Sequence, residues 1–473
     1  MTLSPVSDMS ILELPQELLS HVLSCLDARS VVRFGTTCKE AAEFVNPRNQ
    51  LLWKAVFLHL FDDPSDARSL PSPEGQLAND QEWDWYRHLR RRLVTLRALQ
   101  EHDVNNAGVE DEIDTLLSMI DTAKFSPSPS DAEQGLLAST DDRNLSLNMK
   151  ILAEVNWSCR PGIEMLIHQS RTSGKIKPPT DDRMRVTRSM AATAQYENCR
   201  PESAARLHVL YGITVRERIE HEARGHARRK VYNWHLTGQD NDYGPFKRDG
   251  SGDIDWFLLE AICSVIGRNF EFCVDGHLNM PSGFCYAIPH RTLADPTTPE
   301  DWARITGPWL GTYSFLDYAD LFAFNALEFP DSERPTLDHE DEACGDLMRL
   351  ELKYDQSISS DPRLHTNLPI SPDLPQLFFS GRSRANGGLN RPMIGVRGSV
   401  SLVPSGREVR WRFIISYAGQ DQWQLEGVQP GGVRSGGVYG LWSQCDHEEH
   451  GPVGPFCYFP AELCKPTSIV LMS

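Results

Sequence analysis

The sequence predicts an α+β protein, in which a helical N-terminal part precedes an antiparallel β-barrel. The first observation is a change in hydrophobic period: apolar residues recur about every four positions in the N-terminal part, but alternate from Trp302 onward. The second is the set of glycines in the alternating part, which suits the bulges and sharp bends of a closed sheet. The third is composition, because 473 residues with 40% hydrophobic and 24% charged side chains are typical of a folded chain with several domains.

These patterns divide the chain into four parts. We expect a helical domain at 11–60 and a compact helical unit at 191–275. Between them, residues 61–190 combine helical segments with acidic stretches rich in Pro and Ser, which predicts linkers and partial disorder. The β-barrel is expected at 300–473.

The N-terminal segment Ile11–Phe57 carries more apolar surface than a domain of its size can easily bury internally. Pro15 suits the first turn of a helix, where its missing N–H costs nothing. Apolar residues follow at helical spacing, and Asp27 or Ser30 can cap a second short helix. The surplus apolar surface predicts a protein partner for this segment.

The order of these residues resembles an F-box. The matching elements run from Leu14-Pro15 through Cys38-Lys39 to Leu52-Trp53-Lys54. The resemblance implies docking onto the Skp adaptor and, through it, onto the cullin scaffold of an SCF ubiquitin ligase. On this basis the adaptor-binding residues are expected to be Leu14, Pro15, Leu18, Leu19, Val22, Leu26, Val32 and Trp53. The alternative is an ordinary helical bundle.

The middle helical unit is predicted from apolar stripes and their stop signals. One helix is expected to end at Gly212 and another at Gly267. The segment Lys247–Leu258 resembles a calcium loop in its centre, but lysine and leucine stand where the two end ligands must be anionic oxygens. We therefore expect a glycine turn in which Asp253 or Asp255 caps the next helix.

The barrel strands are predicted from strict alternation of apolar and polar residues. Met393–Val403 and Val409–Tyr417 alternate cleanly, and Gly307–Tyr313 and Leu321–Phe324 are also strand-like. Alternation predicts a meander with one buried face, which leaves two arginines of the second segment on the other face. The expected barrel core is Trp309, Val400, Trp411, Phe413, Trp423 and Trp442.

A second resemblance covers the C-terminal tail and the helical unit. The tail, with Trp309-x-Gly311-x-Tyr313 and His450-Gly451-Pro452, looks like the substrate-receptor barrel of the F-box proteins that target cyclin D. The unit from Leu207 to Phe246 resembles fungal F-box proteins that share this tail. The sequence departs from both at Phe315–Asp320, so the pocket rim and the substrate are expected to differ. Together the resemblances imply a substrate-recognition subunit, a non-catalytic adaptor that presents a target protein for ubiquitination and degradation.

The target site is expected on loops at one end of the barrel, because loops on a rigid scaffold concentrate binding residues. Its expected members are Tyr313, Arg434, Asp446 and His450. Arg434 is the candidate for pairing with a carboxylate of the target, because a guanidinium can pair through two parallel hydrogen bonds. The alternative is that Arg434 and Asp446 pair with each other and tie two loops together.

Two other functions stay open from the sequence. A closed barrel can hold a small molecule or a hydrolytic site, for which Asp446, His447, Glu448 and His450 are the acid or base candidates. The chain can also be an F-box scaffold that binds the adaptor without forming a ligase. Against catalysis, the sequence holds no Gly-x-Ser-x-Gly, phosphate-loop or HExxH motif.

Composition narrows the remaining partners and the compartment. The net charge of −18 argues against general nucleic-acid binding, which needs many basic contacts to phosphate. No apolar run approaches the ~18 residues of a membrane helix, and the start of the chain lacks a signal-peptide pattern. The 11 cysteines include no CxxC, and Cys445, His447, His450 and Cys457 lack zinc-finger spacing. We therefore expect no metal or cofactor, no membrane partner, and a cytoplasmic or nuclear location.

Overall fold

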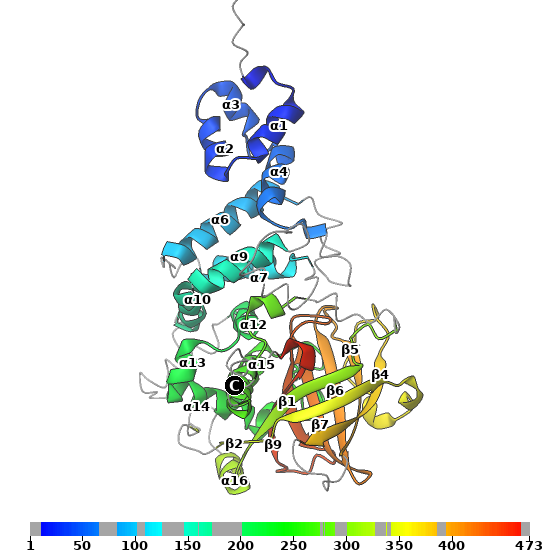
Figure 1. Cartoon of the computed structure of the whole chain (residues 1–473). Coiled ribbons are helices and arrows are strands. Elements are labelled where there is room, and N and C mark those ends of the chain that lie inside the picture. Colours follow the sequence, from blue (N-terminus) through cyan, green and yellow to red (C-terminus); the bar gives the residue numbers. More distant parts are fainter. Residues whose placement is uncertain are drawn as a thin grey trace, which may run out of the picture.

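The computed structural model describes residues 11–65, 83–101, 109–124, 146–158, 160–172, 201–274, 278, 280–288, 300–326, 337, 342–385 and 394–464. It has the predicted α+β fold, with helices in the N-terminal part and a closed antiparallel β-barrel at the C-terminus. Figure 1 shows the N-terminal helices at one end of an elongated molecule and the barrel at the other, with further helices between them.

The N-terminal domain is built from short helices with recognisable start signals. Its elements are η1 (Ile11–Glu13), α1 (Gln16–Ser24), α2 (Ala28–Gly35), α3 (Lys39–Phe44) and α4 (Gln50–Leu60). Helix α1 begins directly after Pro15, as its fixed backbone angle favours. Asp27 caps α2 by accepting a hydrogen bond from the Ser30 backbone N–H at 3.0 Å. The predicted cap is therefore confirmed.

A second group of helices continues the core of this domain without a break. It comprises α6 (Trp85–Glu101), α7 (Val109–Asp121), α9 (Leu147–Ser158), α10 (Arg160–Thr172) and α12 (Glu202–Tyr211). The ring of Trp53 in α4 meets Tyr86 edge-on, with centroids 4.9 Å apart. The buried Arg92 guanidinium lies over Phe57 and Phe61, at 4.8 and 4.9 Å from their centroids. The N-terminal domain and these helices thus share one hydrophobic core.

Asp62 fixes the junction between α4 and the next helices. Its carboxylate accepts hydrogen bonds from the backbone N–H groups of Lys124 and Leu147, at 3.1 and 2.8 Å. Its own backbone N–H donates to the Asn148 side chain at 3.1 Å. Composition assigned this part of the chain to a linker, but a buried aspartate with these partners belongs to the folded core.

The structure confirms two of the three features that the sequence predicted for the middle helical unit. It contains α13 (Val215–Ile219), α14 (His221–Val231), α15 (Trp256–Cys273), η4 (Trp234–Leu236), η5 (Gln239–Asn241) and η6 (Phe284–Tyr286). Gly212 ends α12 with a φ of 91°, and Asp255 caps α15 through the N–H groups of Phe257 and Leu258. The expected stop at Gly267 is wrong, because α15 continues past it. A Cβ on Gly267 would lie 2.8 Å from Ile213 Cδ1, so this glycine permits close packing instead.

The barrel closes through eight strands of the described part. These are β1 (Gly307–Leu316), β3 (Met348–Tyr354), β4 (Leu377–Ala385), β5 (Ile394–Leu402), β6 (Val409–Tyr417), β7 (Gln420–Gln429), β8 (Val438–Gln444) and β9 (Val453–Pro460). Each pairs antiparallel with the next, and β9 returns to β1, where Tyr313 opposes Phe456. Closure leaves no unpaired edge among these strands. Strand β2 (Glu342–Cys344) extends the sheet by pairing with the end of β1.

Shorter elements connect the strands. They are α16 (Tyr318–Ala326), η8 (Gln356–Ile358), η9 (Pro362–Leu364) and η10 (Ala461–Leu463). The prediction of a strand at Leu321–Phe324 is wrong, because this segment lies in α16. Leu321 and Phe324 are three positions apart and are both buried, which is the spacing of one helix face.

The barrel interior is filled by the predicted aromatic residues. Trp309, Val400, Trp411, Phe413 and Trp442 lie in its core, and Trp423 is partly buried against it. The rings of Trp309 and Trp411 pack edge to face, with centroids 4.9 Å apart. The predicted register of the alternating strands is therefore confirmed.

The prediction that only one face of the sheet is buried is wrong on β6 and β7. Arg410 and Arg412 point away from the barrel interior, yet both are buried. Arg410 Nη2 lies 2.7 Å from carboxylate oxygens of Asp242 and Glu426. Arg412 Nη2 lies 2.9 Å from Asp242 Oδ2, and its Nε also pairs with Glu426. This arginine–carboxylate cluster (Arg410, Arg412, Asp242 and Glu426) joins the helical unit to the outside of the barrel.

Candidate functional site

The first candidate site is an exposed apolar surface on α1 and α2. Leu18, Val22, Leu26 and Val32 are 53%, 40%, 41% and 51% exposed, although a short helical domain would gain stability by burying them. Pro15 is also exposed at the start of α1. We call these five residues the N-terminal apolar face. An exposed group of large apolar side chains indicates an interaction surface.

Three residues expected on this surface lie elsewhere. Leu19 and Trp53 are 3% and 2% exposed and belong to the core, and Leu14 is half-buried against it. The indole N–H of Trp53 donates to the Asn46 carbonyl at 3.0 Å, which holds the ring inside the domain. These side chains therefore support the apolar face from beneath, and they do not form part of it.

The second candidate site lies at the end of the barrel that carries the β8–β9 loop. Tyr313, Tyr417 and Trp423 are half-buried there on the inward side of β1, β6 and β7. Trp442 packs beneath them, with its ring centroid 6.2 Å from Tyr313 and 5.2 Å from Trp423. We call these four residues the aromatic mouth. Burial, together with nearby Tyr417 and Asp346, raises the pKa of Tyr313, so its hydroxyl stays neutral.

More aromatic side chains lie beside the mouth, on α16 and the β8–β9 loop. The His450 ring lies 4.9 Å from Trp234 and 5.8 Å from Phe322, between centroids. The Tyr318 hydroxyl donates to the His450 carbonyl at 3.2 Å. Tyr318 and Phe322 are exposed, so this group extends the aromatic surface outside the barrel.

The structure separates Arg434 from the other three residues expected in the target site. Arg434 precedes β8, whereas Asp446 and His450 follow it, so they lie at opposite ends of a strand about 20 Å long. Asp446 instead pairs with Arg363, at 3.4 Å between Nη2 and Oδ1. Neither a shared site with Arg434 nor the alternative pair between Arg434 and Asp446 is therefore formed.

The geometry does not assemble the acid and base candidates of the β8–β9 loop. Asp446, Glu448 and His450 are exposed, and His447 stacks on Tyr243, with centroids 3.6 Å apart. Burial, with repulsion from Arg412, lowers the pKa of His447 to about 4. A group with that pKa is poorly matched to proton transfer near neutral pH. These side chains do not converge on an apolar pocket.

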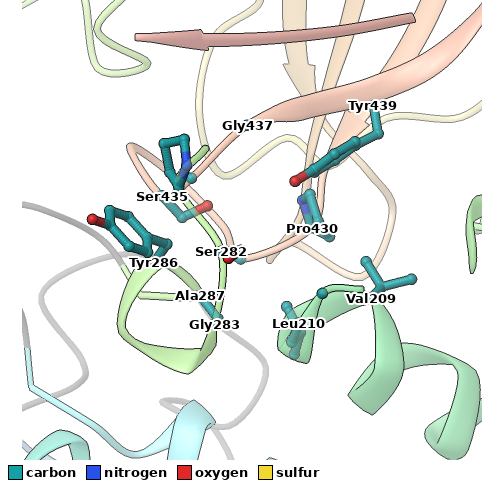
Figure 2. Close-up of a pocket in the computed structure, with 14 residues that line it drawn as sticks. Val209, Leu210, Ser282, Gly283, Tyr286, Ala287, Pro430, Ser435, Gly437 and Tyr439 are labelled. Atoms are coloured by element: carbon teal, nitrogen blue, oxygen red, sulfur yellow. The ribbon is translucent and has the colours of Figure 1, made fainter. Parts of the chain in front are cut away.

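A cavity lies at the junction of α12, the 280–288 segment and the β7–β8 loop. Figure 2 shows Val209 and Leu210 on one side and Pro430 and Tyr439 on the other. The cavity holds about 30 Å³, which is room for a water molecule. Ligand pockets measure roughly 300–1,000 Å³, so this cavity is too small for a metabolite.

A buried histidine of the helical unit, His208, lies between two buried glutamates. His208 Nδ1 lies 2.5 Å from Glu260 Oε1, and its Nε2 lies 2.9 Å from Glu217 Oε2. Burial opposes protonation of His208, but Glu217 and Glu260 outweigh it and raise its pKa. Ser264 donates a further hydrogen bond to Glu217 at 2.7 Å. Nothing in the sequence pattern predicted this cluster, because its members come from α12, α13 and α15.

The described ranges contain neither a metal-binding cluster nor a membrane-spanning helix. Within them, no three or more His, Cys, Asp and Glu side chains are arranged to hold a metal ion. None of the helices in these ranges combines the length and the apolar character needed to cross a membrane.

Comparison with known proteins supports the N-terminal assignment. Residues 11–59 match the F-box-like family. No curated protein and no solved structure matches the chain. The chain therefore has an F-box-like domain followed by a closed antiparallel barrel, and the finer likeness to cyclin-D-targeting or fungal proteins has no support from a relative. F-box-like domains are typically non-catalytic adaptors and are consistent with binding to Skp-type adaptors.

Proposed function

We propose that this chain is the target-recognition subunit of an SCF-type ubiquitin ligase and acts as a non-catalytic adaptor. The observation that carries the proposal is the N-terminal apolar face on an F-box-like domain. Docking onto a Skp adaptor would remove this face from water. The barrel would then hold a target protein, and other subunits would supply the ubiquitin-transfer chemistry.

The helices between the two ends support this division of labour. Their hydrophobic core is continuous with that of the F-box-like domain. At the other end, Asp121 of α7 pairs with Arg206 of α12 at 2.8 Å and with Arg407 of the β5–β6 loop. A packed connection of this kind favours a fixed distance between the adaptor and the target. Fixed proximity raises the effective concentration of the target lysine near the ubiquitin carrier.

We place the target site at the β8–β9 end of the barrel, around Tyr313, Asp446 and His450. The exposed groups there are aromatic rings and the carboxylates of Asp446, Glu448 and Glu449. This combination suits a target segment with a lysine or arginine, which can pair with a carboxylate and lie over a ring. Arg434, at the other end of the barrel, is left out of the proposed site.

The first experiment tests adaptor docking with the double variant Leu18→Asp, Val22→Asp in the full chain. Full burial of such a side chain contributes roughly 1.5–3 kcal/mol. Docking would bury only the exposed half of each, so we expect the affinity for a purified Skp adaptor to fall by at least ~10-fold. Val94→Asp is the matched control, because Val94 is an equally exposed apolar residue on α6, outside the F-box-like domain. Calorimetry or surface plasmon resonance measures both. Unchanged adaptor binding by the double variant would refute the docking surface.

The second experiment separates a ligase subunit from a scaffold that only binds the adaptor. The chain is mixed with Skp adaptor and cullin, and complex formation is followed by size-exclusion chromatography with light scattering. A complex of all three supports the proposal. A chain that binds the adaptor but excludes cullin favours the scaffold alternative.

A further inference from the structure

Two cysteine thiols meet where the middle helical unit contacts the barrel. Cys273 is the last residue of α15, and Cys344 is the last residue of β2. Helix α15 packs against β2, and the Cys273 sulfur contacts the carbonyl of Gly345, the residue that follows Cys344. Strand β2 is held in place by β1, where Cys344 opposes Ser314. Residues far apart in the sequence thus form a dithiol.

The surroundings of this dithiol hold the Cys273 sulfur in a defined position. Its Sγ lies 3.2 Å from Thr312 Oγ1 and 2.9 Å from the Gly345 carbonyl oxygen. Cys344 is exposed and Cys273 is half-buried, so a small solute can reach the pair from water. Both conditions for reaction, proximity of the two thiols and access from water, are therefore met in the folded chain.

The two thiols also differ in acidity, which assigns their roles. Hydrogen bonds from Cys344 and then Thr312 stabilise the Cys273 thiolate against burial and lower its pKa to about 6. The hydrogen bond with Cys273 raises the pKa of Cys344, which keeps its proton. In the reduced chain the Cys273 S–H donates to the Gly345 carbonyl. The lowered pKa favours release of this proton, which supports Cys273 as the nucleophile, because the thiolate is the reactive form of cysteine.

We propose that Cys273 and Cys344 form an oxidation site, which a peroxide converts into a disulfide. The Cys273 thiolate attacks one peroxide oxygen and bonds to it, the O–O bond breaks, and the other oxygen leaves as hydroxide, which takes up a proton and becomes water. Cys273 is then a sulfenic acid. The Cys344 sulfur attacks the Cys273 sulfur, an S–S bond forms, the S–O bond breaks, and the sulfenic oxygen leaves as water with the proton of the Cys344 thiol. The two thiols lose two electrons and two protons in total, and hydrogen peroxide is reduced to two water molecules.

Other described cysteines lack this combination. Cys25 and Cys38 are exposed but lie on the N-terminal domain, where the Cys38 sulfur accepts a hydrogen bond from the Ala41 backbone N–H at 3.4 Å and lies 3.9 Å from the Glu40 carboxylate. Cys464 is buried, and burial raises its pKa to about 12. Cys38 is therefore a matched control for exposure, and Cys464 for burial.

The oxidation would act on one wall of the aromatic mouth. Gly345 follows Cys344, and a Cβ built on it would lie 2.5 Å from the Tyr313 ring. A disulfide would tie this contact to the end of α15 and so restrict movement of β2 beside Tyr313. The inference does not depend on the proposed ligase function, because it concerns chemistry within this chain alone.

The test uses the full chain treated with hydrogen peroxide, then alkylated and digested without reductant. We expect mass spectrometry to find the Cys273 and Cys344 peptides joined, 2 Da below the sum of their masses, and released by dithiothreitol. Cys344→Ser should remove the joined peptide and leave Cys273 as a sulfenic acid, which a dimedone adduct detects. Cys38→Ser should leave the joined peptide unchanged.

Three results would overturn the inference, and none requires a variant. The first is that Cys273 and Cys344 are both still free thiols, and are therefore alkylated, after a peroxide dose that oxidises Cys38. The second is that Cys273 joins a cysteine other than Cys344. The third is that the joined peptide arises between two chains, which mixing chains of different isotope content reveals.

Discussion

Glu426→Gln is the most informative single change in the arginine–carboxylate cluster. Glu426 is 1% exposed and pairs with both Arg410 and Arg412. The uncharged glutamine side chain would leave these two buried guanidinium groups with Asp242 as the remaining carboxylate of the cluster. Removing one partner of a buried ion pair costs about 3–5 kcal/mol, because the other charge stays desolvated. For a domain the size of this barrel, that corresponds to a fall in melting temperature of roughly 10 °C.

The assay is urea unfolding of the full chain, followed by tryptophan fluorescence of the barrel core. Glu351→Gln is the matched control, because the Glu351 side chain is 39% exposed and pairs with Arg349 on the barrel surface at 2.8 Å. A pair of that kind contributes about 0–1 kcal/mol. If both variants unfold at the same urea concentration as the original chain, the cluster does not stabilise the junction between barrel and helical unit.

Three further predictions concern the core, the barrel seam and the helical unit. Trp411→Ala removes a fully buried ring and should cost about 3–5 kcal/mol in urea unfolding, so an unchanged midpoint would contradict the assigned register. Gly311→Ala should destabilise the β1–β9 seam strongly, because the new Cβ would lie 2.0 Å from the Cys457 carbonyl oxygen. Gly395→Ala should be tolerated, because the nearest atoms, in Ser416, lie 3.8 Å from the new Cβ. Circular-dichroism melting compares the two variants. The pKa of His208 is raised in the folded chain above its usual 6.5. Protonated His208 therefore stabilises the folded chain fully below pH 6.5, and this stabilisation is lost as the pH rises through the pKa of the folded chain. His208→Gln should remove that fall in stability, and a pH series of urea midpoints checks it.

Local signals predicted the parts of the fold that local interactions determine. Asp27 and Asp255 cap helices because a side-chain oxygen can reach a free N–H within three residues. The alternation around Trp411 predicted the inward register because side chains of a strand point to opposite faces in turn. The same reasoning failed at Leu321–Phe324, since an apolar run of four residues fits either a strand or one face of a helix.

The candidate sites were harder to predict, because they depend on tertiary contacts. Leu18 and Leu19 are neighbours in the sequence, and both fit the apolar stripe of the predicted helix. Only the packing of α4 against α1 decides that Leu19 is buried and Leu18 is exposed. Arg434 and Asp446 are twelve positions apart, yet β8 between them sends them to opposite ends of the barrel. The dithiol of Cys273 and Cys344 has no sequence signal at all, since α15 and β2 meet only in the folded chain.

The continuous core between the F-box-like domain and the middle helices limits how this protein can be re-engineered. A cut after α4 would expose Phe57 and Phe61, which lie against the Arg92 guanidinium of α6. A cut before β1 would strip α15 from the Phe459 side of the barrel, where Phe270 packs at 5.2 Å between centroids. Exchanging whole domains would therefore create two exposed apolar surfaces. Changing the exposed Asp446, Glu448 and Glu449 of the β8–β9 loop leaves both junctions intact, if His447 and His450 keep their ring contacts with Tyr243 and Trp234. These loop positions are therefore the practical point for changing what the barrel binds.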